Sequence, residues 1–361
     1  MKKIVFTVTN DITYDQRMDR ISTALVEAGY DVTIIGFLKK RSVKTLDKPY
    51  HQVRFKLLFL KGKLFFLAYN FRIFWYLLFH KFDIYCGIDL DTLLPVYMHA
   101  KMRRKPCVYD AHEYYTELPE IVSRPLIKKM WVRLEQLLLP KIRYNYTVGA
   151  AIAKTLSDKY HQPFEVIRNV PILSPDMPKV TRENFILYQG ALNMGRGLEP
   201  LMEAMANIDA NLYIAGEGDL SVELRAFAAA LPHREKIRFL GYVRPDELKS
   251  YTQKAKLGIN LVEHLGLSYY YSLSNKFFDY IHAGLPQITM NFPEYKNLND
   301  KYQVAILIDK PEPQLIAEAV KKLLNDEILY QQLSNNALLA KNELNWQLES
   351  KKLLNIYQQI E

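Results

Sequence analysis

The chain has 361 residues, of which 49% are hydrophobic and 24% are charged, the composition of a soluble globular protein. This length is sufficient for two domains of ordinary size, each with its own core. Its two cysteines, Cys86 and Cys107, exclude a disulfide framework and a cysteine-based zinc site.

The formal charge of +9 is concentrated in the first part of the chain. Residues 1–150 contain 25 Lys or Arg and 14 Asp or Glu, whereas residues 151–361 contain 23 and 25. This asymmetry indicates an anionic partner for the first half, either membrane lipid or nucleic acid. Since no nucleic-acid motif accompanies the basic residues, we expect no nucleic acid.

The segment 53–82 is dense in aromatic and basic residues. We expect part of it to be a core helix of the first domain and the rest to lie on an anionic membrane surface. The amino terminus turns polar at Thr9, too early for a signal peptide, and no apolar run reaches transmembrane length. The expected location is cytoplasmic, with peripheral attachment to the inner membrane face.

The first half alternates strand and helix patterns, which is typical of a parallel sheet built from right-handed βαβ units. Strands are expected at residues 4–8, 31–35, 83–86, 106–109 and 144–148. Helices are expected at residues 17–28, 93–101 and 126–140. The first helix ends at Gly29.

The same rhythm restarts after a proline-rich stretch that contains Pro171, Pro175 and Pro178 and is typical of a linker. Strands are expected at residues 185–189, 212–215, 237–240, 257–261, 288–290 and 305–308, with helices between them. We therefore predict an α/β protein with two Rossmann-like domains, residues 1–168 and 169–343. A terminal helix, residues 344–361, is expected to pack back on the first domain.

The segment 272–286 runs from a polar loop into a helix that Gly284 and the following Leu-Pro end. A helix start exposes unpaired N–H groups and the positive end of the dipole, so it suits a phosphate. We expect Ser272, Ser274, Asn275 and Lys276 to hold a diphosphate and Asp279 to accept hydrogen bonds from sugar hydroxyls. The alternative is a capped amphipathic helix with an incidental acid.

Other loops that follow predicted strands in the second half add to this site, because ligands of open parallel sheets bind at the carboxyl ends of strands. Glycine permits close backbone approach, and arginine can bind phosphate oxygens with two N–H groups. The alternative for these loops is an ordinary turn with a solvated arginine and an exposed tyrosine. The candidates are Gly190, Arg196, Gly197, Gly216, Glu217 and Tyr242.

In the first half, His112 follows a predicted strand and is expected to face a cleft between the domains and contact a sugar ring. Asp110 and Glu113 are candidates to orient it, and a purely structural histidine is the alternative. The loop after the first strand should lie near the same cleft and contributes Asn10, Asp11, Asp15 and Arg17. Asp15 and Arg17 have a second interpretation, as the cap and a salt-bridge partner of the first helix.

Asp89 and Asp91 form an aspartate pair of the kind that holds divalent ions in many nucleotide-sugar enzymes. They precede a helix, where aspartate is favoured as a cap, so we interpret them as capping residues. The eight histidines show no ligand spacing, and no metal site is expected.

In this order and spacing, several stretches match one family. They are Asp-Leu-Asp-Thr-Leu-Leu-Pro, Tyr-Asp-Ala-His-Glu, Gly-Ala-Leu-Asn-Met-Gly-Arg-Gly-Leu, Ala-Gly-Glu-Gly, the segment from Ser274 to Pro286, and the helix that begins near Trp346. Over nearly its whole length the chain resembles the family 4 glycosyltransferases with the GT-B fold, in a bacterial polysaccharide-type branch.

The resemblance implies two Rossmann-like parallel-sheet domains facing across a cleft, with a UDP- or GDP-sugar in the second domain and a glycan or lipid-linked acceptor in the first. It also implies transfer with retention and without a metal or cofactor. By position, His112 matches the active-site histidine, Arg196 the diphosphate-binding cation and Asp279 the second acid of a Glu-x7-Glu motif.

Three positions depart from the family pattern. Tyr271 stands in place of the first acid of that motif, Asn10-Asp11 replaces a glycine pair, and Ala191 replaces an arginine. The expected function is that of a retaining glycosyltransferase of cell-surface polysaccharide synthesis. A nucleotide-sugar 2-epimerase of the same fold is one alternative, and a non-catalytic binding subunit, favoured by Tyr271, is the other.

Overall fold

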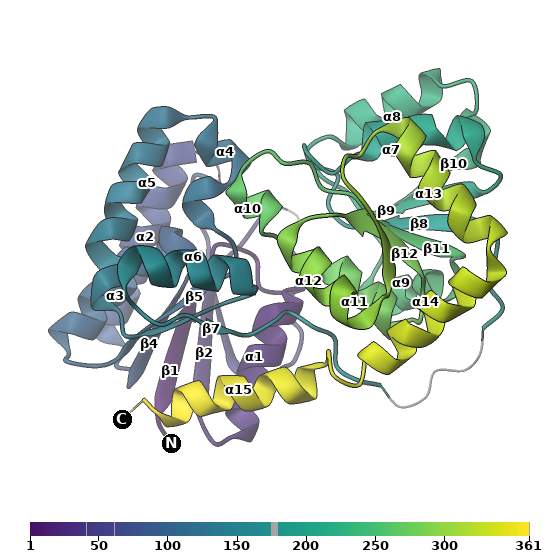
Figure 1. Ribbon diagram of the computed structural model, residues 1–361. Helices are drawn as coiled ribbons and strands as arrows, with labels where there is room; N and C mark the ends of the chain where they lie inside the picture. Colours follow the sequence, from purple (N-terminus) through teal and green to yellow (C-terminus); the bar gives the residue numbers. More distant parts are fainter. Residues whose placement is uncertain (41, 61, 175–179, 361) are drawn as a thin grey trace. The chain divides into compact units, whose positions relative to one another are not determined.

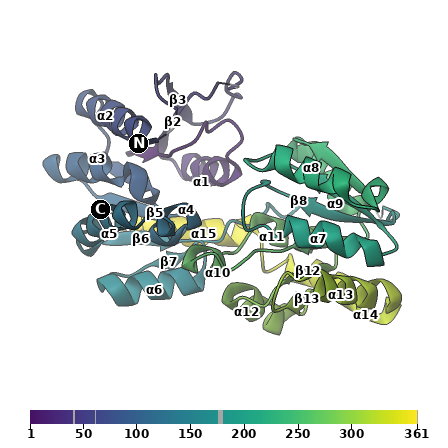
Figure 2. The ribbon, with the colours of Figure 1, turned by 90° about the horizontal axis from the view of Figure 1, so that it is seen from above.

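The computed structural model describes residues 1–40, 42–60, 62–174 and 180–360. The chain divides into two compact units: unit 1 consists of residues 1–169 and 348–361, and unit 2 of residues 170–347. Each unit contains one parallel sheet with helices on its faces (Figures 1 and 2). Pro175 and Pro178 of the expected linker lie outside the described residues, and Pro171 belongs to unit 2.

In unit 1 the strand order of the described sheet is β3-β2-β1-β4-β5-β6-β7, with every pair parallel. The strands are β1 (Lys3–Thr7), β2 (Asp31–Phe37), β3 (His51–Phe55), β4 (Ile84–Ile88), β5 (Cys107–Ala111), β6 (Tyr144–Thr147) and β7 (Glu165–Val166). The helices are α1 (Gln16–Glu27), α2 (Gly62–Phe79), α3 (Asp89–Met102), α4 (Pro119–Val122), α5 (Pro125–Leu138), α6 (Ala150–Tyr160) and α15 (Trp346–Gln358).

In unit 2 the corresponding order is β10-β9-β8-β11-β12-β13, again with every pair parallel. The strands are β8 (Phe185–Gln189), β9 (Asn211–Ala215), β10 (Ile237–Gly241), β11 (Leu257–Asn260), β12 (Gln287–Met290) and β13 (Ala305–Ile308). The helices are α7 (Leu198–Ala204), α8 (Ser221–Ala230), α9 (Pro245–Lys254), α10 (Leu267–Tyr270), α11 (Asn275–His282), α12 (Pro293–Tyr302), α13 (Pro313–Asn325) and α14 (Glu327–Ala340).

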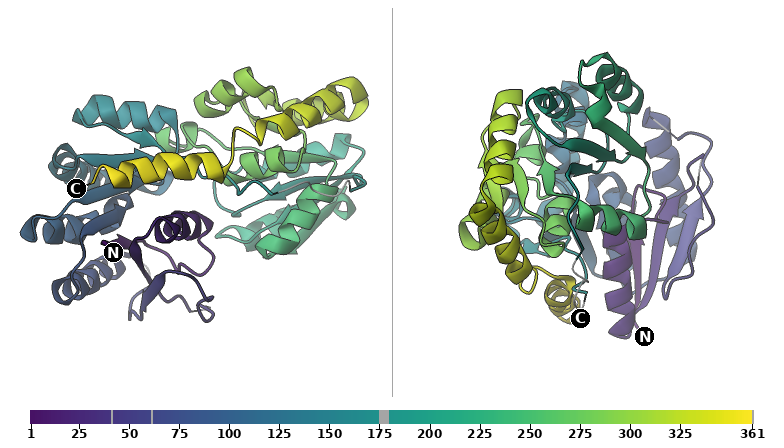
Figure 3. Two further views of the ribbon diagram at one scale, coloured as in Figure 1. Left: turned by 90° about the horizontal axis from the view of Figure 1, so that it is seen from below. Right: turned by 90° about the vertical axis from the view of Figure 1, so that its right-hand side faces the viewer.

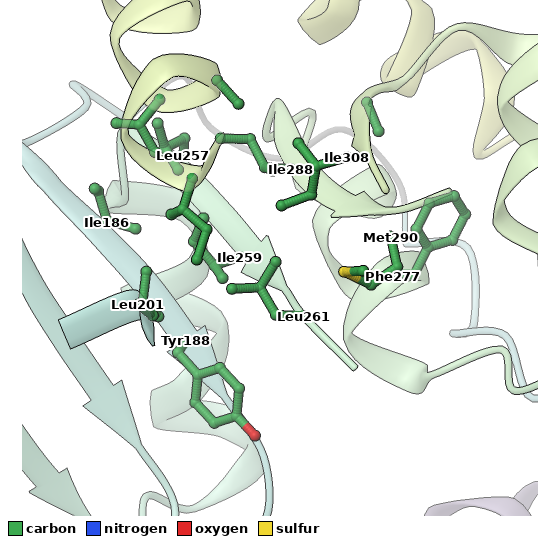
Figure 4. Close-up of a cluster of buried hydrophobic side chains, with 14 of the residues drawn as sticks. Ile186, Tyr188, Leu201, Leu257, Ile259, Leu261, Phe277, Ile288, Met290 and Ile308 are labelled. Carbon is green, nitrogen blue, oxygen red and sulfur yellow. The ribbon is translucent and has the colours of Figure 1, made fainter. Parts of the chain in front are cut away.

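The prediction of two parallel α/β domains is confirmed, and the predicted strands agree with the observed ones to within a few residues. The central strands are buried on both faces, which accounts for their continuous apolar runs. The core of unit 2 gathers strand residues such as Ile186, Ile259 and Ile288 against helix residues such as Leu201 and Phe277 (Figure 4).

One segment differs from its prediction. The expectation for residues 53–82 was a core helix with an interfacial remainder, and no strand was predicted there. The structure has an edge strand, β3, that pairs with β2 from His51 to Phe55, followed by helix α2. Val53 and Phe55 pack into the core of unit 1.

The terminal helix α15 lies against unit 1 (Figure 3). Its Tyr357 is buried, and the Tyr357 hydroxyl is 3.3 Å from that of Tyr146 on β6. The buried Glu349 accepts a hydrogen bond of 3.0 Å from the backbone N–H of Arg168. These contacts attach the C-terminal helix to the last part of the segment 1–169 of unit 1.

Candidate active site

Both sheets reverse their strand order at one point, between β1 and β4 in unit 1 and between β8 and β11 in unit 2. Ligands of open α/β sheets bind outside the carboxyl ends of the strands at such a switch point. The predicted donor residues lie in the loops that follow β8, β9, β10 and β11 or within α11. The predicted acceptor residues lie in the loop after β1 and the first turn of α1, and at the end of β5 and in the loop that follows it.

The structure brings two cations of unit 2 together over tyrosine rings. Lys276, near the start of α11, is only 8% exposed, and its Nζ stands 3.8 Å from the ring centroid of Tyr188. The Arg196 guanidinium stands 4.7 Å from the ring centroid of Tyr269. In the described part of the chain no salt bridge includes either cation, and Arg196 Nε has no hydrogen-bond partner.

The electrostatics of Lys276 follow from this arrangement. Burial lowers the pKa of Lys276 well below its ordinary value, and the positive charge of Arg196 lowers it further. The Asp279 carboxylate opposes both effects in part. An anion placed beside Lys276 and Arg196 would favour the charged ammonium, so the pair is suited to a diphosphate.

The backbone around this pair is drawn together by hydrogen bonds between successive loops. Gly190 N donates to Ala215 O at 2.9 Å, and Gly216 N donates to Gly241 O at 2.8 Å. Gly190 has a φ of +136°, and a Cβ there would lie 3.4 Å from Lys276 Nζ. A Cβ on Gly216, whose φ is +147°, would collide with the carbonyl oxygen of Gly190. Glycine is therefore required for the two loops to approach each other and the lysine.

Asp279 is held at the carboxyl end of β8, whose last residue is Gln189. Gln189 Nε2 donates to Asp279 Oδ2 at 2.8 Å, and Thr252 Oγ1 donates to Gln189 Oε1 at 2.9 Å. The Ser274 hydroxyl donates to Asn260 Oδ1 at 2.8 Å and makes no cap on α11. Ser274 is therefore not a side-chain cap of α11, because its hydroxyl is bound to β11.

The remaining donor candidates lie around this centre or have structural contacts. Glu217 forms a salt bridge of 2.5 Å with Arg225, and the Tyr242 side chain is largely exposed. Gly197 has a φ of +61°, and a Cβ there would come within 2.8 Å of Leu261 Cβ, so it is a packing position. The Tyr271 ring lies 5.5 Å from that of Tyr270, and the buried Ser272 hydroxyl has no partner within the described residues. Asn275 is the first residue of α11.

In unit 1 the structure brings Arg17, Asp110 and His112 together. Arg17 Nη2 donates to Asp110 Oδ1 at 2.9 Å, and His112 Nε2 lies 2.9 Å from Asp110 Oδ2. Arg17 and Asp110 are buried, whereas the His112 side chain is 19% exposed. With Nε2 bound to Asp110, Nδ1 is the second polar atom of the ring and can face a ligand.

Burial alone would lower the pKa of His112, but the Asp110 carboxylate outweighs it and raises that pKa above its ordinary value. For Asp110 the signs are reversed: burial alone would raise its pKa, but the positive charges of Arg17 and His112 lower it below the ordinary value. The cluster thus keeps Asp110 ionised and favours the protonated imidazole.

The other acceptor candidates make local contacts. Asp15 Oδ1 accepts the Met18 N–H at 2.9 Å and caps α1, as the second interpretation of this residue expects. Asn10 Nδ2 donates to Asp15 Oδ2 at 2.5 Å. Asp11 accepts from Arg54 Nη1 at 2.9 Å, in a cluster at the edge of the sheet. The backbone N–H of Glu113 donates to Asp89 at 3.4 Å.

The interpretation of Asp89 and Asp91 as caps of α3 is wrong, because α3 begins without a side-chain cap. Asp89 has a φ of +55°, and its Oδ1 accepts the backbone N–H of His112 at 2.9 Å. Burial raises the pKa of Asp89 to about 8 and that of Asp91 to about 7. Asp91 Oδ1 has no hydrogen-bond partner among the residues described. The sequence signal for a role of these two aspartates in the site was their place at the end of β4, beside the switch point.

The buried Asp91 gives a first prediction. Its folded pKa of about 7 lies above its ordinary value of 3.8, so the folded state binds the extra proton between these pH values. Stability from this group is therefore lost as the pH rises from about 4 to about 7, by an amount on the order of 3 kcal/mol. Asp91→Asn should remove this loss, so the variant gains stability relative to the wild type at higher pH.

Denaturant unfolding on both sides of this pH window measures the difference. Glu120→Gln, a change at an exposed acid of the same unit, is the matched control and should follow the wild type. An Asp91→Asn curve parallel to that of the wild type across the window would show that Asp91 is ionised in the folded protein.

Comparisons with known proteins agree with this architecture. A model of the group 1 glycosyl transferases matches residues 171–339, and a model of glycosyltransferase family 4 matches residues 16–171. An uncharacterized glycosyltransferase of Methanocaldococcus jannaschii is 28% identical over 182 residues, which are 48% of this chain and 45% of that protein. The match thus spans less than half of that relative.

Solved structures share the fold over almost the whole chain. Sucrose-phosphate synthase from Thermosynechococcus elongatus has a TM-score of 0.79 at 15% identity and covers 99% of both chains. HepE of Anabaena, solved with UDP-glucose, has a TM-score of 0.75 at 14% identity over 99% of this chain and 100% of its own. The two parallel-sheet units are those of a GT-B fold. The chain belongs to the family 4, group 1 glycosyltransferases.

Proposed function

We propose that the chain transfers a sugar from a nucleoside diphosphate sugar to a hydroxyl of a glycan or lipid-linked acceptor in cell-surface polysaccharide synthesis. The observation that carries this proposal is the pair of cations Arg196 and Lys276 at the switch point of unit 2. Within the described residues, neither cation forms a salt bridge with a carboxylate. UDP is the first nucleotide to test, because the structures of HepE were solved with UDP and UDP-glucose.

The leaving diphosphate would be held by charges already in position. Lys276 and Arg196 supply two positive charges, and α11 directs its positive end toward the same strand ends. Fixed charges in a site that excludes water commonly provide the largest catalytic effect. In this proposal the two side chains and the helix neutralise the diphosphate, and no metal ion takes part.

Asp279 is the candidate for binding hydroxyls of the donor sugar, since Gln189 fixes the carboxylate through Oδ2 at 2.8 Å. Tyr271 has no carboxylate, so of positions 271 and 279 only Asp279 offers an acid to the donor sugar. In unit 1, His112 is the candidate for contacting the transferred sugar through Nδ1, with Asp110 orienting the ring at 2.9 Å.

The reaction proposed is a substitution at the anomeric carbon with retention. The acceptor hydroxyl oxygen bonds to the anomeric carbon on the face from which the phosphate leaves, and the bond between that carbon and the phosphate oxygen breaks. The hydroxyl proton passes to the departing phosphate oxygen, so no additional base is required. Arg196 and Lys276 stabilise the charge that develops on that oxygen.

A panel of UDP- and GDP-sugars, incubated with and without an acceptor glycan mixture, tests this function. We expect acceptor-dependent release of the nucleoside diphosphate, a product with retained configuration, and a rate that EDTA changes by less than about twofold. Nucleotide release with an altered free sugar and no acceptor dependence would identify an epimerase. Nucleotide binding without turnover of any donor would identify a binding subunit.

A further inference from the structure

Helix α2 has two apolar faces. One face carries Phe65, Tyr69, Ile73 and Leu77 and is buried in the core of unit 1. The other carries large apolar side chains that are exposed: Leu64, Leu67, Phe71, Trp75, Leu78 and Phe79. Their spacing of mostly three and four residues places them in one stripe. Single exposed apolar residues are common, but a stripe of this length marks an interaction surface.

Two neighbouring helices extend this surface. Helix α3 contacts both α2 and α5, and the three helices lie side by side in two views (Figures 1 and 2). Each of the two also has exposed apolar residues at helical spacing, Leu94, Met98 and Met102 on α3 and Leu126, Met130 and Leu137 on α5. We refer to the exposed side of α2, α3 and α5 as the three-helix face.

The charge of the three-helix face has a single sign. No Asp or Glu occurs from residue 48 to residue 82 or from residue 92 to residue 109. The acids within these helices do not add exposed negative charge: Asp91 of α3 is buried, and Asp89 at its start accepts the backbone N–H of His112. Glu135 of α5 is buried and paired with Lys159 at 2.9 Å. Exposed bases accompany the apolar stripes, namely Lys63, Arg72, Lys101, Lys129 and Arg133.

We propose that the three-helix face docks on a membrane surface that contains anionic lipid. Its apolar side chains would enter the boundary between headgroups and acyl chains, while its bases bind lipid phosphates. A second copy of the chain fits this face less well, because a twofold interface would bring like charges together. Among the described helices, none is both long and apolar enough to cross a bilayer.

Trp75 provides a direct reporter, because it is 43% exposed whereas Trp131 and Trp346 are buried. Vesicles with equal parts of phosphatidylglycerol and phosphatidylcholine should sediment the protein at low salt and shift its tryptophan emission to shorter wavelength. Trp75→Tyr should keep vesicle binding and lose most of the spectral shift. Both measurements are made without substrate, so their outcome is independent of the proposed function.

Two paired variants separate the apolar and charge contributions. Leu67→Ser with Phe71→Ser, and separately Lys129→Glu with Arg133→Glu, should each lower vesicle partitioning by about tenfold or more. Ile328→Ser with Leu339→Ser changes two exposed apolar residues of α14 in unit 2 and should leave partitioning unchanged. Thermal melting verifies that each variant is folded.

Three results would overturn the proposal. The first is no binding to the anionic vesicles at low salt, and the second is equal binding to pure phosphatidylcholine vesicles. The third is a loss of vesicle partitioning in the α14 control as large as that in the variants of the three-helix face. Sedimentation velocity tests whether a second copy of the chain covers the three-helix face instead. A dimer of the wild type that the Leu67 and Phe71 changes dissociate would assign the three-helix face to a second copy of the chain instead.

Discussion

Replacing Lys276 by methionine is expected to lower the rate of glycosyl transfer by about two to three orders of magnitude, the effect typical of removing one preorganised charge from an active site. Methionine keeps the aliphatic contact with the Tyr188 ring, so the fold should persist and the lost quantity is the positive charge. Arg196→Ala should have an effect of similar size. Initial rates with the best donor of the panel measure both.

Lys256→Met is the matched control, because Lys256 also stands over a tyrosine ring, that of Tyr330 at 4.5 Å. Lys256 precedes β11, at the opposite end of the strand from the site. Its replacement should leave the transfer rate within about twofold of the wild type. Rates within a few-fold of the wild type for both Lys276→Met and Arg196→Ala would contradict the assigned diphosphate site.

Asp110→Asn is expected to destabilise the protein by about 3 kcal/mol or more, because it leaves two buried or half-buried cations without their carboxylate. The cost should fall in the double variant Arg17→Met with Asp110→Asn, in which the charge left without a partner is also removed. Denaturant unfolding of the wild type, both single variants and the double variant gives the interaction energy.

The pH dependence of this cluster has a defined sign. Because Asp110 raises the pKa of His112, the attraction between them stabilises the fold fully below the ordinary histidine value of 6.5. This contribution is lost as the pH rises through the folded pKa.

The control for Asp110→Asn is Asp158→Asn, at an exposed helix pair with Lys154, which should change stability by less than about 0.5 kcal/mol. An equally small effect of Asp110→Asn would show that the cluster is not ionised as described.

The fold could be predicted from the sequence because its signals are local. Continuous apolar runs such as residues 4–8 and 185–189 are typical of strands that are buried on both faces. Strand β3 was missed because its five residues include His51, Gln52 and Arg54, which lie at a sheet edge and lack a buried pattern. The neighbouring aromatic helix dominated the interpretation of that segment.

The candidate site could be predicted only where one segment carries the signal. Lys276 and Asp279 stand on a single helix, and Arg196 stands in a glycine-rich loop after a strand. The pairing of Arg17 with Asp110 joins residues 93 positions apart, and only the sheet order brings them together. Tyr269 beneath Arg196 and Gln189 beside Asp279 have no sequence signal, since a tyrosine and a glutamine are unremarkable in a loop or at a strand end.

The proposed transfer reaction depends most on Lys276, a buried cation that would bind the diphosphate. Calorimetric titration of UDP and GDP in buffers of different ionisation enthalpy measures both affinity and proton exchange. Since burial and Arg196 lower the pKa of Lys276, a bound diphosphate should restore its proton. The wild type should therefore take up as much as one proton per nucleotide as the pH rises. Lys276→Met should take up none and bind about tenfold more weakly or worse. Equal proton uptake and equal affinity in the two proteins would show that Lys276 does not bind the diphosphate.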